Sequence, residues 1–315
     1  MQSLDLHNPW PGAPVLFRER TGSTMEDALA LARDGYPGGT TVVTDFQEAG
    51  RGRLAERRWR SEAGKNLLFT QLLRDTLLEG PQRLPLLVGL AVSRALEGSF
   101  SLQPVIKWPN DVLCRLTGGR RAAGSGGMDG GGSFGSEGGS AKRGVRASAK
   151  RGVRAIFASE GGSAKRGVRV IFGSEGGVFA KVAGILCEAV AEGTGIVLLA
   201  GVGLNCNQLE FPGEPGAVSL ARLLGREVDR LQLLERILAE IRTSLQERDW
   251  KAALLERLHY LGREVTFHQG PPDNVAPGRA VRGVLEGVED DGALRIRIPG
   301  GQTKIFYSGE LTEAP

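Results

Sequence analysis

A basic, glycine-rich segment divides this sequence into two parts. Residues 117–178 contain 19 of the chain's 47 glycines. Two consecutive units, 148–162 and 163–177, differ at only two of 15 positions, and 140–147 repeats the first eight residues of the unit. Each unit has few apolar side chains, so burial cannot offset the entropy lost on ordering it. We therefore predict a flexible insertion, with a folded protein built from the residues on either side.

The basic character of the chain comes from this insertion. The whole chain has a formal net charge of +4, whereas 117–178 hold 11 basic and 4 acidic side chains, a net charge of +7, which leaves −3 for the rest. A nucleic-acid-binding arm made of the basic repeats is an alternative, non-enzymatic function. Its phenylalanines are too isolated to stack a run of bases.

Composition excludes several protein classes. No apolar run reaches the length of about 18 residues that a membrane helix needs, and the N-terminus has no signal-peptide pattern. The three cysteines, Cys114, Cys187 and Cys206, form no C-x-x-C motif, so we expect reduced thiols and a cytoplasmic protein. The three histidines have no metal-ligand spacing, so we expect no catalytic histidine.

Periodicity before the insertion predicts alternating strands and helices. The S-x-x-E pattern at 23–26 predicts a capping box that starts a helix ending at Gly35, and Pro81 predicts the start of a helix that reaches about Leu96. Predicted strands lie at 15–20, 40–45, 66–73, 105–108 and 111–114, of which the last two form an antiparallel pair.

After the insertion, the pattern changes twice. Apolar strands are predicted at 181–190 and 195–204, and helical spacing follows at 226–249 and about 250–260. Four short strands with glycine-containing turns then predict a small β-barrel, at 264–269, 279–288, 293–298 and 303–308. We therefore predict an α+β fold with two domains: 1–260, which carries the insertion, and 261–315.

Four motifs combine charged side chains with glycines or tight turns. Residues 47–53 (QEAGRGR) place arginines among glycines, which lets guanidinium and backbone N–H groups approach an anion, although an exposed loop without a ligand is an alternative. Residues 107–111 (KWPND) set an amide and a carboxylate in a turn. Residues 181–186 (KVAGIL) begin a strand with a lysine, and 201–205 (GVGLN) end a strand at an amide.

In this combination and order, the motifs resemble those of the biotin protein ligases, or biotin–[acetyl-CoA-carboxylase] ligases. The resemblance runs from about Val15 to the C-terminus, apart from 117–178. It implies a mixed sheet flanked by helices, followed by an SH3-like C-terminal β-barrel. It also implies an ATP-dependent ligase that forms biotinyl-5′-AMP with Mg²⁺ and then transfers biotin to a lysine of the biotin carboxyl carrier domain of acetyl-CoA carboxylase.

The resemblance also assigns roles to individual residues. Catalytic roles fall on Arg53, Lys107, Asp111 and Lys181, and Asp111 is also the expected Mg²⁺ ligand. Adenylate binding falls on Trp59, Asn110 and Asn205. Biotin binding falls on Ser23, Thr24, Met25, Gln47, Arg51, Gly52, Arg53 and Lys181.

This chain departs from the family pattern in three ways. Met25 replaces a position that is more often small and polar, and the loop from Arg53 to Trp59 is one residue longer than in some members. The third departure is the insertion, which separates Asp111 from Lys181 by 70 positions.

The partners implied are biotin, ATP and a carrier protein, without a membrane. Only about 14 residues precede the first predicted strand, too few for the DNA-binding domain of some members, so we expect no DNA binding. A homodimer, the identity of the carrier and the role of the insertion stay open. A lipoate ligase, which shares the catalytic fold, is the alternative enzyme.

Overall fold

The computed structural model describes residues 1–53, 57–74, 80–116, 171–172, 178–192, 195–269 and 280–314. All of them belong to one compact unit. The predicted flexible insertion at 117–178 therefore lies outside the described residues, except for 171–172 and 178.

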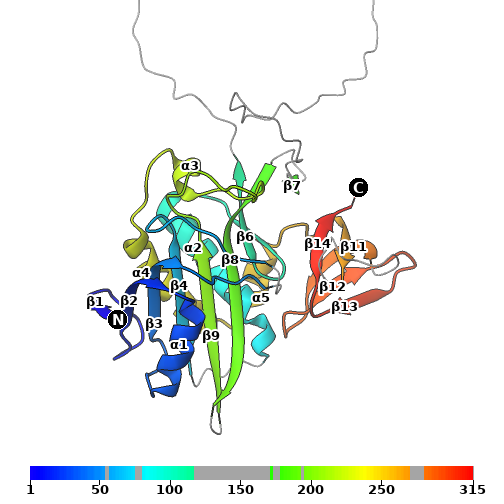
Figure 1. Ribbon diagram of the computed structural model, residues 1–315. Helices are drawn as coiled ribbons and strands as arrows, with labels where there is room; N and C mark the ends of the chain where they lie inside the picture. Colours follow the sequence, from blue (N-terminus) through cyan, green and yellow to red (C-terminus); the bar gives the residue numbers. More distant parts are fainter. Residues whose placement is uncertain are drawn as a thin grey trace, which may run out of the picture. The chain divides into compact units, whose positions relative to one another are not determined.

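A mixed nine-stranded sheet forms the centre of the fold (Figure 1). Only β2 and β3 pair in parallel among the strands of its main path; the other neighbours are antiparallel. The short β7 (Ile171–Phe172) pairs with β8 beside this path. The path runs in the order β1 (Gln2–Leu4), β2 (Val15–Thr21), β3 (Thr41–Gln47), β4 (Leu67–Leu73), β9 (Gly195–Leu204), β8 (Val178–Glu192), β6 (Asp111–Leu116) and β5 (Val105–Lys107).

Helices cover both faces of this sheet because its central strands are apolar on both sides. Leu16, Val42 and Leu72 pack in one cluster with the buried residues of α1 (Thr24–Arg33). Their chain neighbours point to the opposite face and pack against α2 (Leu84–Phe100) and α4 (Arg230–Gln246). The sheet lies between these two layers.

The C-terminal strands form a second, antiparallel sheet. Its order is β13 (Thr303–Phe306), β12 (Leu294–Arg297), β11 (Ala280–Val288), β10 (Glu264–His268) and β14 (Glu310–Glu313). The α+β class and the C-terminal antiparallel sheet are thus confirmed, whereas closure into a barrel and the domain boundary at 260 stay predictions. The two sheets share a hydrophobic cluster into which Trp108 is inserted, with its indole N–H donating to Gly292 O at 3.0 Å.

Some elements differ from the sequence prediction. The terminal strands β1 and β14 and the short helix α3 (Leu220–Leu224) were not predicted, and a 3-10 turn, η1 (Pro81–Arg83), precedes α2. The strand β7 was not predicted either; it lies within the insertion predicted to be flexible and forms by pairing with the start of β8. The helix predicted at 250–260 ends early, since α5 covers only Trp250–Leu255. The chain leaves the helix there because Ile106 of β5 pairs with its backbone: Ile106 N donates to Arg257 O, and His259 N donates to Ile106 O.

The cysteine prediction is confirmed. All three cysteines are free, and burial raises the pKa of the Cys114 and Cys206 thiols to about 12 and raises that of Cys187 further. In the described part of the chain, no helix has both the length and the apolar character needed to cross a membrane. The cytoplasmic location stays a prediction.

Candidate functional site

The start of α1 is held by Gln47 at the end of β3. Thr24 donates to Gln47 Oε1 from both its backbone nitrogen, at 2.8 Å, and its hydroxyl, at 3.0 Å. Ser23 is the N-cap residue, but its side chain makes no capping hydrogen bond, so the capping-box prediction is wrong in this respect. The Gln47 side chain instead accepts from the first amide of the helix, that of Thr24. Thr24 also accepts a hydrogen bond from Thr70 of β4 at 2.8 Å.

A β-bulge turns Lys181 toward this side of the sheet. Val112 pairs with Ala183 and Leu113 pairs with Lys181, so Val182 is an extra residue in β8. Without the bulge, Lys181 and Gly184 would point to opposite faces, because side chains alternate along a strand. Here a β-carbon added to Gly184 would lie only 3.0 Å from Nζ of Lys181. The same nitrogen lies 2.7 Å from Oδ1 of Asp111, and both side chains are partly exposed.

Three glycines of β8 and β9 lie below these side chains, and we call Gly184, Gly201 and Gly203 the glycine floor. Gly184 and Gly203 are partners in the register, and Gly201 pairs with Thr70 on the other side of β9. A β-carbon on Gly201 would lie 2.8 Å from Sδ of Met25, and one on Gly203 would lie 2.5 Å from Cε2 of Trp59. Both side chains therefore rest directly on backbone.

The arginine-rich loop contacts both the main sheet and the C-terminal sheet. Arg51 is half-exposed near Glu26 and Glu188, at 4.0 and 3.8 Å. Arg53 donates to Gly309 O at 2.9 Å and to Ser308 Oγ at 3.4 Å, just before β14. Desolvation lowers the pKa of Arg53 from its usual value, and the negative charges of Glu310 and Asp111 oppose this.

Glycine at position 52 allows this loop to fold back on itself. Gly52 N donates to Arg57 O at 2.9 Å, and Trp59 N donates to Gly50 O at 3.0 Å. A β-carbon on Gly52 would lie 2.9 Å from Cβ of Arg57. The close pairing of these two segments places the Trp59 side chain over the sheet.

The two predicted asparagines are committed to backbone contacts. Asn110 donates from Nδ2 to Ile185 O at 2.9 Å, and Asn205, which is buried, donates to Val218 O at 3.2 Å and Lys181 O at 3.4 Å. Both amides therefore brace the strand that carries Lys181. Lys107 is the register partner of Asp111 in the β5–β6 pair. The ligand-binding roles of all three residues stay predictions.

The structure thus brings most of the predicted residues to one face of the sheet, around the glycine floor. Three further residues that contact the predicted site residues were not identified from the sequence: Thr70, Gly309 and Glu310. A threonine inside the apolar run LLFTQLL is a sequence signal that could have identified Thr70. Nothing local marks Gly309 and Glu310, because their importance comes from a contact more than 250 positions away in the chain.

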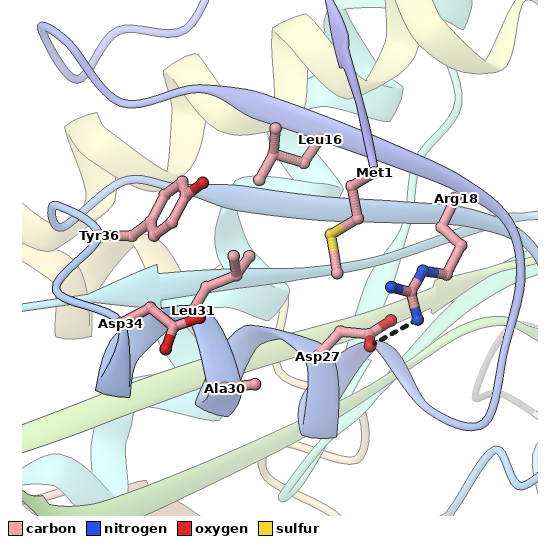
Figure 2. A pocket seen from close by; sticks show the side chains of 8 residues that line it. All are labelled: Met1, Leu16, Arg18, Asp27, Ala30, Leu31, Asp34 and Tyr36. Atoms are coloured by element: carbon pink, nitrogen blue, oxygen red, sulfur yellow. Dashed lines mark hydrogen bonds and ion pairs between the residues drawn. The ribbon is translucent and has the colours of Figure 1, made fainter.

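The two described cavities lie away from these residues. One, of about 330 Å³, lies beside α1 and contains the paired side chains of Arg18 and Asp27, 3.3 Å apart (Figure 2). The other, of about 640 Å³, is lined by residues such as Lys65, Arg222 and Glu227. No predicted site residue lines either cavity. Among the described residues, no group of three or more His, Cys, Asp or Glu side chains is placed to hold a metal ion.

Comparisons with known proteins point to one family. Residues 260–311 match the family model described as the biotin protein ligase C-terminal domain. The chain is 28% identical to a biotin–[acetyl-CoA-carboxylase] ligase of Paracoccus denitrificans, with 92% of this chain and 99% of the relative covered. It is 26% identical to the bifunctional ligase/repressor BirA of Bacillus spizizenii, with 95% and 74% covered.

A solved structure supports the same assignment across nearly the whole chain. The biotin protein ligase of Aquifex aeolicus, in complex with biotin and ATP, is 26% identical and superposes with a TM-score of 0.63. The similarity covers 95% of this chain and 97% of that one. The arrangement of both sheets is therefore that of a known group of ligases.

Proposed function

We propose that this chain, which belongs to the biotin protein ligases, uses ATP to attach biotin to a lysine of the biotin carboxyl carrier domain of acetyl-CoA carboxylase. The observation that carries this proposal is the arrangement of polar groups along the glycine floor. At one end, Thr70 donates a hydrogen bond to Thr24 and is the register partner of Gly201. At the other end, Lys181 lies beside Gly184, which is the register partner of Gly203.

The Thr24 end and the Lys181 end of the glycine floor are marked by Gly201 and by the Gly203–Gly184 pair. Gly201 and Gly203 are two residues apart on β9, which corresponds to about 7 Å along a strand. The hydroxyl of Thr24 and the side-chain amide of Gln47 would bind a polar ring at one end of the glycine floor. The ammonium of Lys181 would hold a carboxylate at the other. The glycines between them carry no side chains of their own, and in this structure the side chains of Met25 and Trp59 lie against them.

The first step joins two negatively charged groups. A carboxylate oxygen of biotin attacks the α-phosphorus of ATP; the new C–O–P bond forms as the bond to the bridging oxygen breaks, and pyrophosphate leaves. Lys181 would offset the repulsion and stabilise the transition state. This explains why the reaction needs no nucleophilic side chain of the enzyme.

In the second step, the amine of the target lysine attacks the carbonyl carbon of the anhydride. An amide bond forms, AMP leaves and the nitrogen loses a proton. The enzyme must keep water away from the anhydride until the carrier arrives. Trp59 would contribute to this protection, since its ring lies against Gly184 and Gly203.

Magnesium would enter this site with the nucleotide. The only carboxylate of the described residues in contact with Lys181 is that of Asp111. A single carboxylate fits Mg²⁺, because this ion keeps several waters and is commonly held by one or two carboxylates together with substrate phosphates. When bound, the ion neutralises phosphate charge. Assignment of Asp111 to this role is part of the proposal.

The test is ATP–pyrophosphate exchange with the purified chain, followed by transfer to a carrier domain. We expect exchange with biotin and not with lipoate, and a biotin-dependent mass increase of the carrier at one lysine. Exchange with lipoate alone would favour the lipoate ligase alternative. No exchange with either acid would contradict the proposed ligase activity.

A further inference from the structure

The indole of Trp59 covers part of the glycine floor in this structure. A β-carbon on Gly203 would lie 2.5 Å from Cε2 of Trp59, and one on Gly184 would lie 2.9 Å from Cζ3. These distances are too short for any side chain larger than hydrogen, so the ring is in direct contact with the backbone of two neighbouring strands. The space between the Thr24 end of the floor and Lys181 is thus partly filled by a residue of the chain itself.

The other contacts of Trp59 leave its indole N–H without a hydrogen-bond acceptor among the described residues. The indole nitrogen is buried. Lys181 Nζ lies 5.6 Å from the ring centroid, a cation–π distance, while also contacting Asp111. A buried N–H without an acceptor costs free energy, which makes this position easier to leave.

We propose that Trp59 is an internal competitor of the substrate: its indole and the ring of biotin use the same glycine floor, so biotin binds only when the indole moves off it. This proposal rests on the proposed function, because it takes biotin as the acid whose ring lies along the floor. Part of the binding free energy of biotin is then used to displace the indole. Its affinity is correspondingly lower than that of a site with an open floor.

A different role for the same residue would give opposite results. If Trp59 were a fixed wall, biotin would stack on its outer face, and removing the indole would remove a favourable contact. Competition and stacking therefore predict opposite signs for the effect of a truncation on the affinity for biotin. The sign is measurable without ATP, in the full chain.

The first experiment measures biotin binding by calorimetry in the wild-type chain and in Trp59→Ala, without nucleotide. We expect Trp59→Ala to bind biotin roughly tenfold more tightly, because the indole no longer covers Gly184 and Gly203 before the ligand arrives. Equal or weaker binding by Trp59→Ala would overturn the proposal. If the wild-type chain neither binds biotin nor exchanges pyrophosphate, it is the proposed function that fails.

The second experiment follows the indole itself and does not depend on the folding of the alanine variant. Saturating biotin should shift the tryptophan emission of the wild-type chain, because the Trp59 ring changes its environment. Trp59→Phe should lose this shift. Trp10→Phe, which removes an indole that packs against Gly39 instead, should keep it. An emission spectrum of the wild-type chain unchanged by saturating biotin, or a shift that persists in Trp59→Phe, would contradict the displacement.

Discussion

Nζ of Lys181 lies 2.7 Å from Oδ1 of Asp111, although the sequence separates the two residues by 70 positions. The pair forms because β6 and β8 are neighbours in the sheet and because the bulge at Val182 turns Lys181 to the face on which Asp111 lies. Both side chains are less than 35% exposed. A cation and a carboxylate thus stand together beside the glycine floor, where the proposed reaction brings a carboxylate and phosphates into contact.

We predict that Lys181→Met abolishes most of the adenylation activity. Loss of the ammonium should lower the rate of biotin-dependent pyrophosphate exchange by about 10²- to 10³-fold, the usual effect of removing one group that stabilises transition-state charge. The free energy of unfolding should change by only about 1 kcal/mol or less, because the pair is partly exposed. Lys304→Met, on the exposed strand β13, is the control, and exchange at the wild-type rate in Lys181→Met would refute the assigned role.

The loop arginine is predicted to retain the adenylate. Arg53→Gly removes the contacts to Gly309 and Ser308 that hold the loop against the C-terminal sheet. We expect more biotinyl-5′-AMP to be released into solution, as measured by chromatography after a single turnover. Arg60→Gly, a change of the same kind at an exposed position, should leave retention unaltered. Wild-type retention in Arg53→Gly would show that this side chain does not keep the loop closed.

The insertion is predicted to be dispensable for biotinylation. Leu116 and Val178 are partners in the antiparallel register, so an Asn-Gly turn can join them after removal of 117–177. Replacing the 61 residues of 117–177 by a two-residue turn should raise the free energy of unfolding by about 3 kcal/mol. Transfer of biotin to a carrier domain and urea unfolding check both expectations.

A second deletion serves as the control for this variant. Removing only 124–167 keeps β7, which pairs with the start of β8. If the longer deletion unfolds and the shorter one folds, β7 is required and the insertion is not a simple loop. Loss of folding in both variants would contradict the prediction.

Acid is predicted to destabilise the protein through His259. Burial, with smaller effects of Lys107 and Arg263, lowers the pKa of His259 to about 4, and its ring lies between Phe179 and Tyr260. His259 is therefore protonated near pH 6.5 in the unfolded chain, but only near pH 4 in the folded chain. The free energy of unfolding is therefore unaffected by His259 above pH 6.5. As the pH decreases from 6.5 to 4, it decreases by up to about 3 kcal/mol.

The measurement compares urea unfolding of the wild-type chain with that of His259→Phe from pH 7.5 to pH 4. The phenylalanine variant keeps an aromatic ring and cannot be protonated, so its stability should fall less steeply below pH 6.5. Parallel pH profiles for the two proteins would mean that His259 is not the responsible group.

Most of the secondary structure followed from local patterns, and the failures have a common cause. The strands β4, β8 and β9 were predicted within a few residues because each is a long, mostly apolar run, and β2 and β3 because each contains a short run of apolar and β-branched residues. In contrast, β1 and β14 are short and polar, so only their pairing with β2 and β10 makes them strands. The early end of α5 likewise depends on a distant partner, Ile106.

The sequence by itself determined the family resemblance, the apolar strands and the set of polar side chains that the site would use, since motif identity and alternation are local properties. Only the tertiary structure decided how these side chains are arranged. The bulge that turns Lys181 and the Gln47 contact that starts α1 each depend on residues far apart in the chain. The glycine floor beneath Trp59 also depends on residues far apart in the chain, because the strand register and the contact with Trp59 are established only when the sheet assembles.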